Sequence, residues 1–229
     1  LDGDGVLDLV SANRGQFPGD SGNLTVFFQL GSGSFSAALA LDAPGQPFVL
    51  KAADLDGDSD HDLVSVNVFG QPLTVFYQSS AGAFSGAEVL DGTAGGSNLE
   101  ITDLDGSGTL DLVLGPAVFF QSDPGHFAPP FLLDGALGGG AFRGVSVVAD
   151  FDRDGALDIA GGGLGVAYQA SPGSFSPFLL VNPSGGLGMA AGDLDGDGRV
   201  DLAVVSGGES TVALFRHSTP GDFPVLQTI

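Results

Sequence analysis

The stretch DLDGDGRVDLAVVS, residues 193–206, places four aspartates within nine residues and then runs directly into an apolar segment. Carboxylates this close repel one another, so such a cluster is unfavourable unless a cation lies among them. The pattern occurs five times along the chain, as LDGDGVLDLV (1–10), DLDGDSDHDLV (54–64), DLDGSGTLDLV (103–113), DFDRDGALDIA (150–160) and DLDGDGRVDLA (193–203). This recurrence indicates a repeat architecture for the whole chain.

The spacing between the repeats narrows the choice of fold class. We number each acidic loop from its first Asp. Loops 2 to 5 are residues 54–62, 103–111, 150–158 and 193–201, and loop 1, residues 1–8, begins at position 2. The successive position-3 aspartates are 54, 49, 47 and 43 residues apart, a period typical of propellers, solenoids or arrays. We therefore expect a single domain, 1–229, with repeats at approximately 1–44, 45–95, 96–142, 143–185 and 186–229.

The remainder of each repeat is predicted to form β-strands. A β-branched run such as 62–68 follows the loop, and a second apolar run such as LTVFYQ (73–78) comes next. A Gly-containing turn then ends in a Phe that we expect to begin a third strand, and a fourth strand such as 45–53 leads into the next loop. The 39 Gly and 13 Pro leave almost no window for a helix. Four short antiparallel strands per unit predict an all-β protein, a β-propeller of four-stranded blades.

The count of strands is uneven at the two ends of the chain. The later three strands occur in all five repeats, but the first strand occurs in four, since the chain begins within loop 1 and ends in FPVLQTI (223–229), an outer strand. One alternative is a closed ring of five blades with one thin blade; we expect instead a fragment of a larger propeller of about seven blades.

Composition excludes several classes of partner. Six Lys and Arg against 28 Asp and Glu give a net charge of -22, which repels nucleic acid and anionic membrane surfaces. There is no apolar run of about 18 residues, so no membrane insertion is expected. The absence of Cys excludes disulfides and thiol catalysis. The partners that we expect are a protein or glycan ligand of unknown identity and, beside it, further domains of the same polypeptide.

The acidic loops have the chemistry of a calcium site. Carboxylates fall at positions 1, 3, 5 and 9, and Gly is usual at position 6, where it allows the positive φ that folds a loop around a centre. Position 7 varies, which suggests that only its backbone carbonyl is used. A donor set of oxygens alone suits a hard cation, and about six to eight of them favour calcium over magnesium.

Two other calcium loops share part of this pattern and are excluded. An EF-hand needs a Glu at position 12 and flanking helices, whereas position 12 holds Ser11, Ser65, Leu114, Gly161 and Val204. A dockerin loop also needs helices, where this chain has β-branched runs.

With its following strands, the repeat D-x-D-x-D-G-x-x-D-L-x resembles the FG-GAP or VCBS repeat, which forms calcium-loop blades in integrin α-subunit propellers and in secreted bacterial proteins. The resemblance covers nearly the whole chain. It implies a propeller with calcium held in the hairpin loop between the first two strands of a blade, but no single activity, since related repeats occur in adhesion modules, lectins and enzymes.

The metal ligands implied by the resemblance differ between loops. Loops 2, 4 and 5 match fully. Loop 3 has Ser107 at position 5, and loop 1 lacks position 1. In loop 2, Ser59 replaces the Gly and Asp60 adds a fifth carboxylate. The candidate ligands are Asp2, Asp4, Asp8, Asp54, Asp56, Asp58, Asp62, Asp103, Asp105, Ser107, Asp111, Asp150, Asp152, Asp154, Asp158, Asp193, Asp195, Asp197 and Asp201.

The sequence thus favours a non-catalytic calcium-binding module that acts in binding, adhesion or scaffolding, secreted or at the cell surface, where calcium concentrations fill weak sites. A carbohydrate-binding propeller is a first alternative, although the chain has no Trp and two Tyr. Part of a polysaccharide-degrading enzyme is a second. We interpret His61, His126 and His217 as surface turn residues rather than catalytic or zinc-binding groups.

Overall fold

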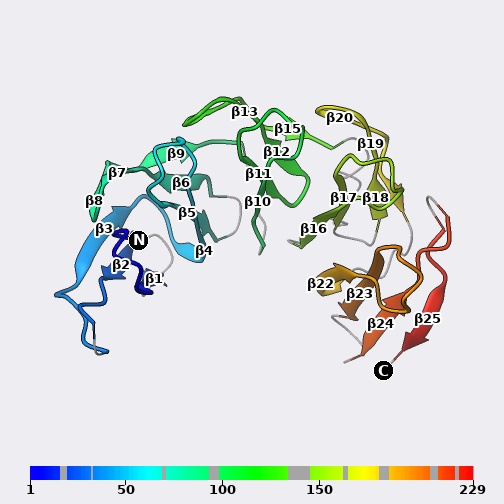
Figure 1. Cartoon of the computed structure of the whole chain (residues 1–229), viewed down its shortest axis with the longest axis horizontal. Helices are drawn as coiled ribbons and strands as arrows, with labels where there is room; N and C mark the ends of the chain where they lie inside the picture. The colour runs from blue at the N-terminus through cyan, green and yellow to red at the C-terminus, as the bar shows by residue number, and fades with distance from the viewer. Residues whose placement is uncertain are drawn as a thin grey trace. The chain divides into compact units, whose positions relative to one another are not determined.

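The computed structural model describes residues 1–15, 20–31, 33–68, 71–92, 98–133, 145–161, 165–180, 186–206, 211–219 and 222–228. Every regular element within these ranges is a β-strand, and all strand pairs are antiparallel (Figure 1). The all-β prediction is confirmed.

Four sheets have four strands each, in the orders β4-β5-β6-β9, β10-β11-β12-β15, β16-β17-β18-β21 and β22-β23-β24-β25. The first contains β4 (Pro47–Ala53), β5 (Asp62–Asn67), β6 (Leu73–Phe76) and β9 (Glu88–Leu90). The second contains β10 (Glu100–Thr102), β11 (Asp111–Leu114), β12 (Ala117–Phe119) and β15 (Phe131–Leu132). The third contains β16 (Ser146–Ala149), β17 (Asp158–Gly161), β18 (Gly165–Ala167) and β21 (Leu179–Leu180). The fourth contains β22 (Gly186–Gly192), β23 (Asp201–Ser206), β24 (Val212–Phe215) and β25 (Val225–Thr228).

A further sheet, at the start of the chain, has three strands: β1 (Leu9–Asn13), β2 (Gly22–Phe27) and β3 (Leu39–Ala43). Strand β1 follows loop 1 as β5 follows loop 2, and no described strand takes the place of β4 in this sheet. The main sheets of the described residues therefore have four strands each, with one fewer in the first, as the sequence predicted.

Three small hairpins differ from the prediction. They are β7 (Gln78–Ser80) with β8 (Ala83–Phe84), β13 (Gln121–Asp123) with β14 (His126–Phe127), and β19 (Gln169–Ser171) with β20 (Ser174–Phe175). Single bridges from Gln29 to Phe35 and from Thr219 to Asp222 stand in the same places in the other two repeats. The Phe that we expected to begin the third strand ends this hairpin instead. The tight turn, with a Gly at positive φ, pairs the Phe back onto the Gln, and the third sheet strand begins only afterwards.

The chain forms two compact units, Leu1–Gly95 with Gln121–Pro129, and Gly96–Phe120 with Pro130–Ile229. Within each unit, neighbouring sheets bury apolar faces against one another. In the first unit Leu24 and Val26 of β2 pack with Leu63 of β5 and Phe76 of β6. The middle strands β5 and β6 are buried along their whole length, because both of their faces are covered.

The second unit has two such cores. One joins the β10–β15 and β16–β21 sheets through Val113, Val118 and Ile159. The other joins the β16–β21 and β22–β25 sheets through Val166 and Leu202. Loops 2 to 5 each immediately precede a middle strand of one of these packed sheets, so the cores fix the position of these loops.

Candidate metal centres

Each acidic loop turns through two residues at positive φ. Position 6 is one of them, as the sequence predicted, and Ser59 adopts it with φ 78° where the other loops have Gly. Position 4 is the second, and it is Gly in four loops but Arg153 in loop 4, with φ 67°. The replacement of Gly by Ser in loop 2 therefore leaves the loop conformation unchanged.

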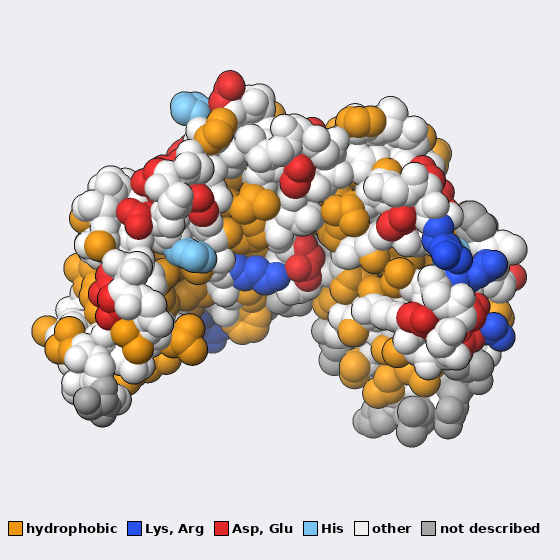
Figure 2. Space-filling model, viewed as in Figure 1, with side chains coloured by type: hydrophobic (Ala, Val, Ile, Leu, Met, Phe, Trp, Pro, Cys, Tyr) orange, Lys and Arg blue, Asp and Glu red, His pale blue; other side chains and the backbone are white. Residues whose placement is uncertain are grey.

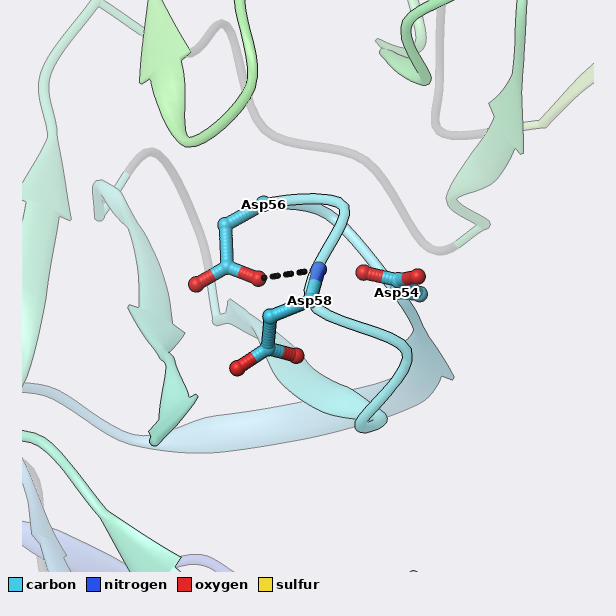
Figure 3. A group of neighbouring side chains, drawn as sticks. All are labelled: Asp54, Asp56 and Asp58. Carbon is cyan, nitrogen blue, oxygen red and sulfur yellow. Dashed lines mark hydrogen bonds between the residues drawn. The ribbon is translucent and has the colours of Figure 1, made fainter. Parts of the chain in front are cut away.

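The carboxylates at positions 1, 3 and 5 turn inward because they accept hydrogen bonds from the backbone of their own loop. In loop 2, Ser59 N donates to Asp54 Oδ2 (3.0 Å), Asp58 N to Asp56 Oδ1 (3.2 Å) and Asp60 N to Asp58 Oδ1 (2.8 Å). Figure 3 shows these three side chains around the turn, with the bond from the Asp58 amide to Asp56 dashed. The same set recurs in loop 5, from Gly198, Asp197 and Arg199.

The position-9 aspartate has a different environment from the other three. Asp62, Asp111 and Asp158 are fully buried, and Asp201 is 1% exposed. In loop 2 the two oxygens of Asp62 accept hydrogen bonds from Leu55 N (2.8 Å) and Gln78 N (2.7 Å), and Asp158 and Asp201 are bound in the same way. This aspartate thus joins the loop to the strand that leads into the small hairpin.

Carboxylate oxygens gather closely in four of the five loops. Ligand atoms of three aspartates lie within 4.8 Å of one another in each group. The groups are Asp54, Asp56 and Asp58; Asp103, Asp105 and Asp111; Asp150, Asp152 and Asp158; and Asp193, Asp195 and Asp197. Oxygens bound to one calcium ion at about 2.3 to 2.6 Å lie at most about 5 Å apart, so the spacing suits a shared cation.

Some predicted ligands lie outside these groups. Among the described residues, loop 1 forms no such group from Asp2, Asp4 and Asp8. Asp62, Asp154 and Asp201 belong to fully matching loops but are not in the close groups of three. Ser107 lies at its predicted place in loop 3, where its hydroxyl is 2.8 Å from the hydroxyl of Thr109.

The donor chemistry fits calcium. The groups offer carboxylate oxygens only, which is the ligand type of a hard cation. In loop 3 the Oδ1 atom of Asp103 is buried and has no hydrogen-bond partner, although buried carboxylate oxygens are normally satisfied. Coordination of a cation would satisfy this oxygen.

Electrostatics differ between the loops. Burial raises the pKa of Asp56 and of Asp152, and the neighbouring carboxylates of each loop raise it further. Burial likewise raises the pKa of Asp62, and that of Asp158 to about 6. In loop 5, by contrast, a hydrogen bond from the backbone of Arg199 and the charge of Arg216 lower the pKa of Asp197. Within the described residues, the negative charge of loops 2 and 4 is therefore balanced less well than that of loop 5.

A glutamine that the sequence did not single out ties loop 1, and likewise loop 3, to the next repeat. Gln78 Nε2 donates to the carbonyl of Leu1 in loop 1 (2.7 Å), and Gln169 Nε2 donates to that of Leu104 in loop 3 (2.9 Å). The hairpin glycine closes the contact, since Gly82 N and Gly173 N donate to the Oε1 atoms of these glutamines. A signal was present in the sequence, because Gln follows the aromatic residue in four of the five repeats.

The three histidines differ in burial. His61 and His126 are exposed, as expected for surface turn residues. His217 is not, and that interpretation was wrong: it is 2% exposed and stacks on Phe223 with ring centroids 4.5 Å apart. It stands where the other repeats have the hairpin Gln, a position that faces inward.

A family model described as FG-GAP-like repeat matches residues 1–65 and 54–114. A search of curated proteins found no match. Among solved structures, the chain is similar to an Agrocybe aegerita lectin described as specifically recognising non-reducing terminal N-acetylglucosamine, with 19% identity and a TM-score of 0.56 over 95% of this chain. It is also similar to the V. cholerae biofilm matrix protein Bap1, with 18% identity and a TM-score of 0.61 over 100% of this chain.

At these identities the likeness is one of fold. The chain spans 64% of the length of the lectin and 37% of that of Bap1. Within the described residues, no helix has the length and apolar character that crossing a membrane would require.

Proposed function

Because the chain belongs to the FG-GAP-like repeat family, we propose that it is a non-catalytic calcium-binding β-propeller module that serves in binding, adhesion or scaffolding outside the cell. The observation that carries this proposal is the gathering of three carboxylates within 4.8 Å in each of loops 2 to 5. Calcium would be held by the aspartates of these loops at positions 1, 3, 5 and 9, with Ser107 at position 5 of loop 3.

Bound calcium would supply the positive charge that the loops lack. It would offset both the burial and the repulsion between carboxylates that raise the pKa of Asp56 and of Asp152. Since the loop carbonyls of Leu1 and Leu104 accept hydrogen bonds from the next repeat, fixing the loop also fixes its contact with that repeat. A ligand that binds only the folded loop stabilises the fold by mass action.

The propeller itself is part of the proposal. Successive antiparallel sheets that share cores with their neighbours are what blades require. A single domain over 1–229, and a full propeller of about seven blades to which these five repeats contribute, follow from the same reasoning. The secreted or cell-surface location rests on the calcium concentration that weak sites of about 10⁻⁴ to 10⁻³ M need.

Calcium titration by calorimetry on EDTA-stripped protein, with thermal melts alongside, tests the proposal. We expect saturable binding at three or more sites and a rise in melting temperature, both lost stepwise in Asp56→Asn and Asp152→Asn. The matched control is Asp123→Asn, which removes an exposed carboxylate from β13, outside the loops. No binding heat and no change in melting temperature would refute the calcium site.

A glycan ligand is the second candidate for the binding function. The observation that favours it is an aromatic surface: Phe131 is 40% exposed, and its ring lies 6.3 Å from those of Phe120 and Phe175. Aromatic faces can stack on sugar rings, and a structural neighbour is a lectin. A glycan array with calcium present separates the candidates. Saturable binding that Phe131→Ala abolishes would favour the glycan, and an array without signal would favour a protein partner.

A further inference from the structure

Arg216 takes a position that is aromatic in every other repeat. The residue before the hairpin Gln is Phe28, Tyr77, Phe120 or Tyr168, whereas the fifth repeat reads Phe-Arg-His at 215–217. This position lies beside the acidic loop of its own repeat. A Cβ atom on Gly125 would be 3.2 Å from Asp56 Cβ and 3.8 Å from Tyr77 Cε1, so the aromatic ring and the position-3 aspartate share one neighbour.

The guanidinium of Arg216 reaches the loop carboxylates directly. Its Nε atom is 2.6 Å from Asp195 Oδ2, and its Nη2 atom is 3.3 Å from Asp197 Oδ2. Arg199, at position 7 of the same loop, lies 3.9 Å from Asp197 Oδ2 and donates a hydrogen bond to the carbonyl of Ser218. Figure 2 shows Lys and Arg side chains gathered with acidic ones at the right of the view, over the β22–β25 sheet.

We propose that Arg216 is an internal cation of loop 5, which keeps this loop folded without metal and makes it bind calcium more weakly than loop 4. The inference rests on the proposed function, because it ranks the calcium sites of one chain. Sequence alone predicts no such ranking, and instead makes loops 4 and 5 equal, because both carry aspartate at positions 1, 3, 5 and 9.

The ranking follows from the charges. A calcium ion in loop 5 has to displace the guanidinium from Asp195 and Asp197 or tolerate a like charge a few ångströms away. A unit charge about 5 Å from a dication weakens binding about tenfold even when the medium screens as well as water does. The Arg216 side chain is 46% exposed, so displacement into solvent is open to it and the site is weakened rather than abolished.

Amide resonances of ¹⁵N-labelled protein, followed during a calcium titration of the EDTA-stripped chain, resolve the loops from one another. Gly198 reports loop 5 and Gly155 reports loop 4, since both occupy position 6. In the unaltered protein we expect half-saturation of loop 5 at about tenfold higher calcium than loop 4. Arg216→Gln should bring the two together, while Arg216→Lys, which keeps the charge, should preserve most of the gap. Arg14→Gln, which removes an exposed arginine from the other unit, is the charge-matched control and should change neither loop.

Metal-free melts give a readout that does not involve calcium. Asp154 and Asp197 both stand at position 5, and each accepts one backbone hydrogen bond, from Ala156 (2.8 Å) and from Arg199 (2.9 Å). Asp154→Asn relieves repulsion within loop 4 and should raise the melting temperature. Asp197→Asn removes a partner of Arg216 and should lower it.

The outcomes separate this inference from the proposed function. If the position-6 residues of loops 2 to 4 (Ser59, Gly108 and Gly155) respond to calcium but Gly198 saturates at the same concentration as Gly155, the ranking is overturned and the calcium module stands. A rise in melting temperature for Asp197→Asn, equal to that for Asp154→Asn, would also overturn it. If no loop responds to calcium, the ranking and the proposed function fall together.

Discussion

Replacement of Asp201 by Asn tests the structural role of the position-9 carboxylate. Asp201 is 1% exposed, and its two oxygens accept hydrogen bonds from Leu194 N (3.0 Å) and His217 N (2.8 Å). Asparagine has nearly the same shape but only one acceptor oxygen, and its NH₂ group must face the second backbone donor. The variant should therefore destabilise the protein even when no metal is present.

The magnitude follows from the two hydrogen bonds. One backbone N–H loses a charged acceptor and stays buried, which costs about 1 to 3 kcal/mol, and the facing NH₂ group is left without an acceptor as well. We expect a loss of about 2 to 3 kcal/mol in the free energy of unfolding. For a chain of this size that corresponds to a fall of roughly 5 to 10 °C in melting temperature.

The assay is urea unfolding in EDTA, followed by far-ultraviolet circular dichroism because the chain has no Trp. Asp123→Asn is the control, since it makes the same chemical change at an exposed site on β13, and it should stay within about 0.5 kcal/mol of the unaltered protein. A loss for Asp201→Asn no larger than that of the control would refute the reasoning. It would mean that the loop and the hairpin strand hold together without the two bonds.

Three further predictions concern the loops and their contacts. Burial raises the pKa of Asp158 to about 6, so between about pH 4 and pH 6 the folded metal-free protein holds a proton that the unfolded chain has released. The free energy of unfolding should therefore fall as pH rises through this range, by up to about 3 kcal/mol. Urea titrations at pH 5 and 7.5 measure this fall, and calcium should abolish it. Tyr77→Phe removes the hydrogen bond from the Tyr77 hydroxyl to the carbonyl of Gly125 (3.0 Å) and should lower the free energy of unfolding by about 1 kcal/mol in the same urea assay. Unchanged stability would contradict the contribution of this contact. Gly125→Ala should lower the free energy of unfolding by about 1 to 2 kcal/mol, because Gly125 has φ 77° and a Cβ would lie 3.2 Å from that of Asp56. Gly86→Ala is the control and should cost much less, because a Cβ there meets nothing within 4 Å. Equal losses for the two variants would contradict the steric argument.

The features that could be predicted from the sequence are those that the five repeats specify again and again. Five copies of the loop fix the period and the strand that follows, so the described sheets appear where the sequence places them. The inward placing of positions 1, 3 and 5 was predictable because alternate residues of a tight loop share a side, and loops 2 and 5 gather these three carboxylates. Loops 3 and 4 instead gather the carboxylates of positions 1, 3 and 9. Among the described residues, the three aspartates of loop 1 form no such group.

The features that the sequence did not predict depend on contacts between repeats. From the sequence, Gln78 is an ordinary strand residue; only the structure shows that its side-chain amide donates a hydrogen bond to the carbonyl of Leu1, far away along the chain. For the same reason His217 reads as a surface residue, although the position it shares with that Gln is buried. In the sequence Arg216 is one of six basic residues with no marked partner, and the three-dimensional structure shows that its guanidinium contacts Asp195.

These contacts give the acidic loop a second role beside metal binding. The loop lies between two elements, because its position-9 aspartate holds the strand of its own repeat and its position-2 carbonyl accepts a bond from the hairpin of the next. In the first unit the same relation holds between loop 2 and the β13–β14 hairpin, where Gly125 N donates to the carbonyl of Leu55 (3.1 Å). A cation that orders the loop must therefore strengthen the joint between repeats as well as the turn itself. Repeat arrays derive their stability from such nearest-neighbour contacts, and this explains why the carboxylates stand at these joints rather than on the outer strands.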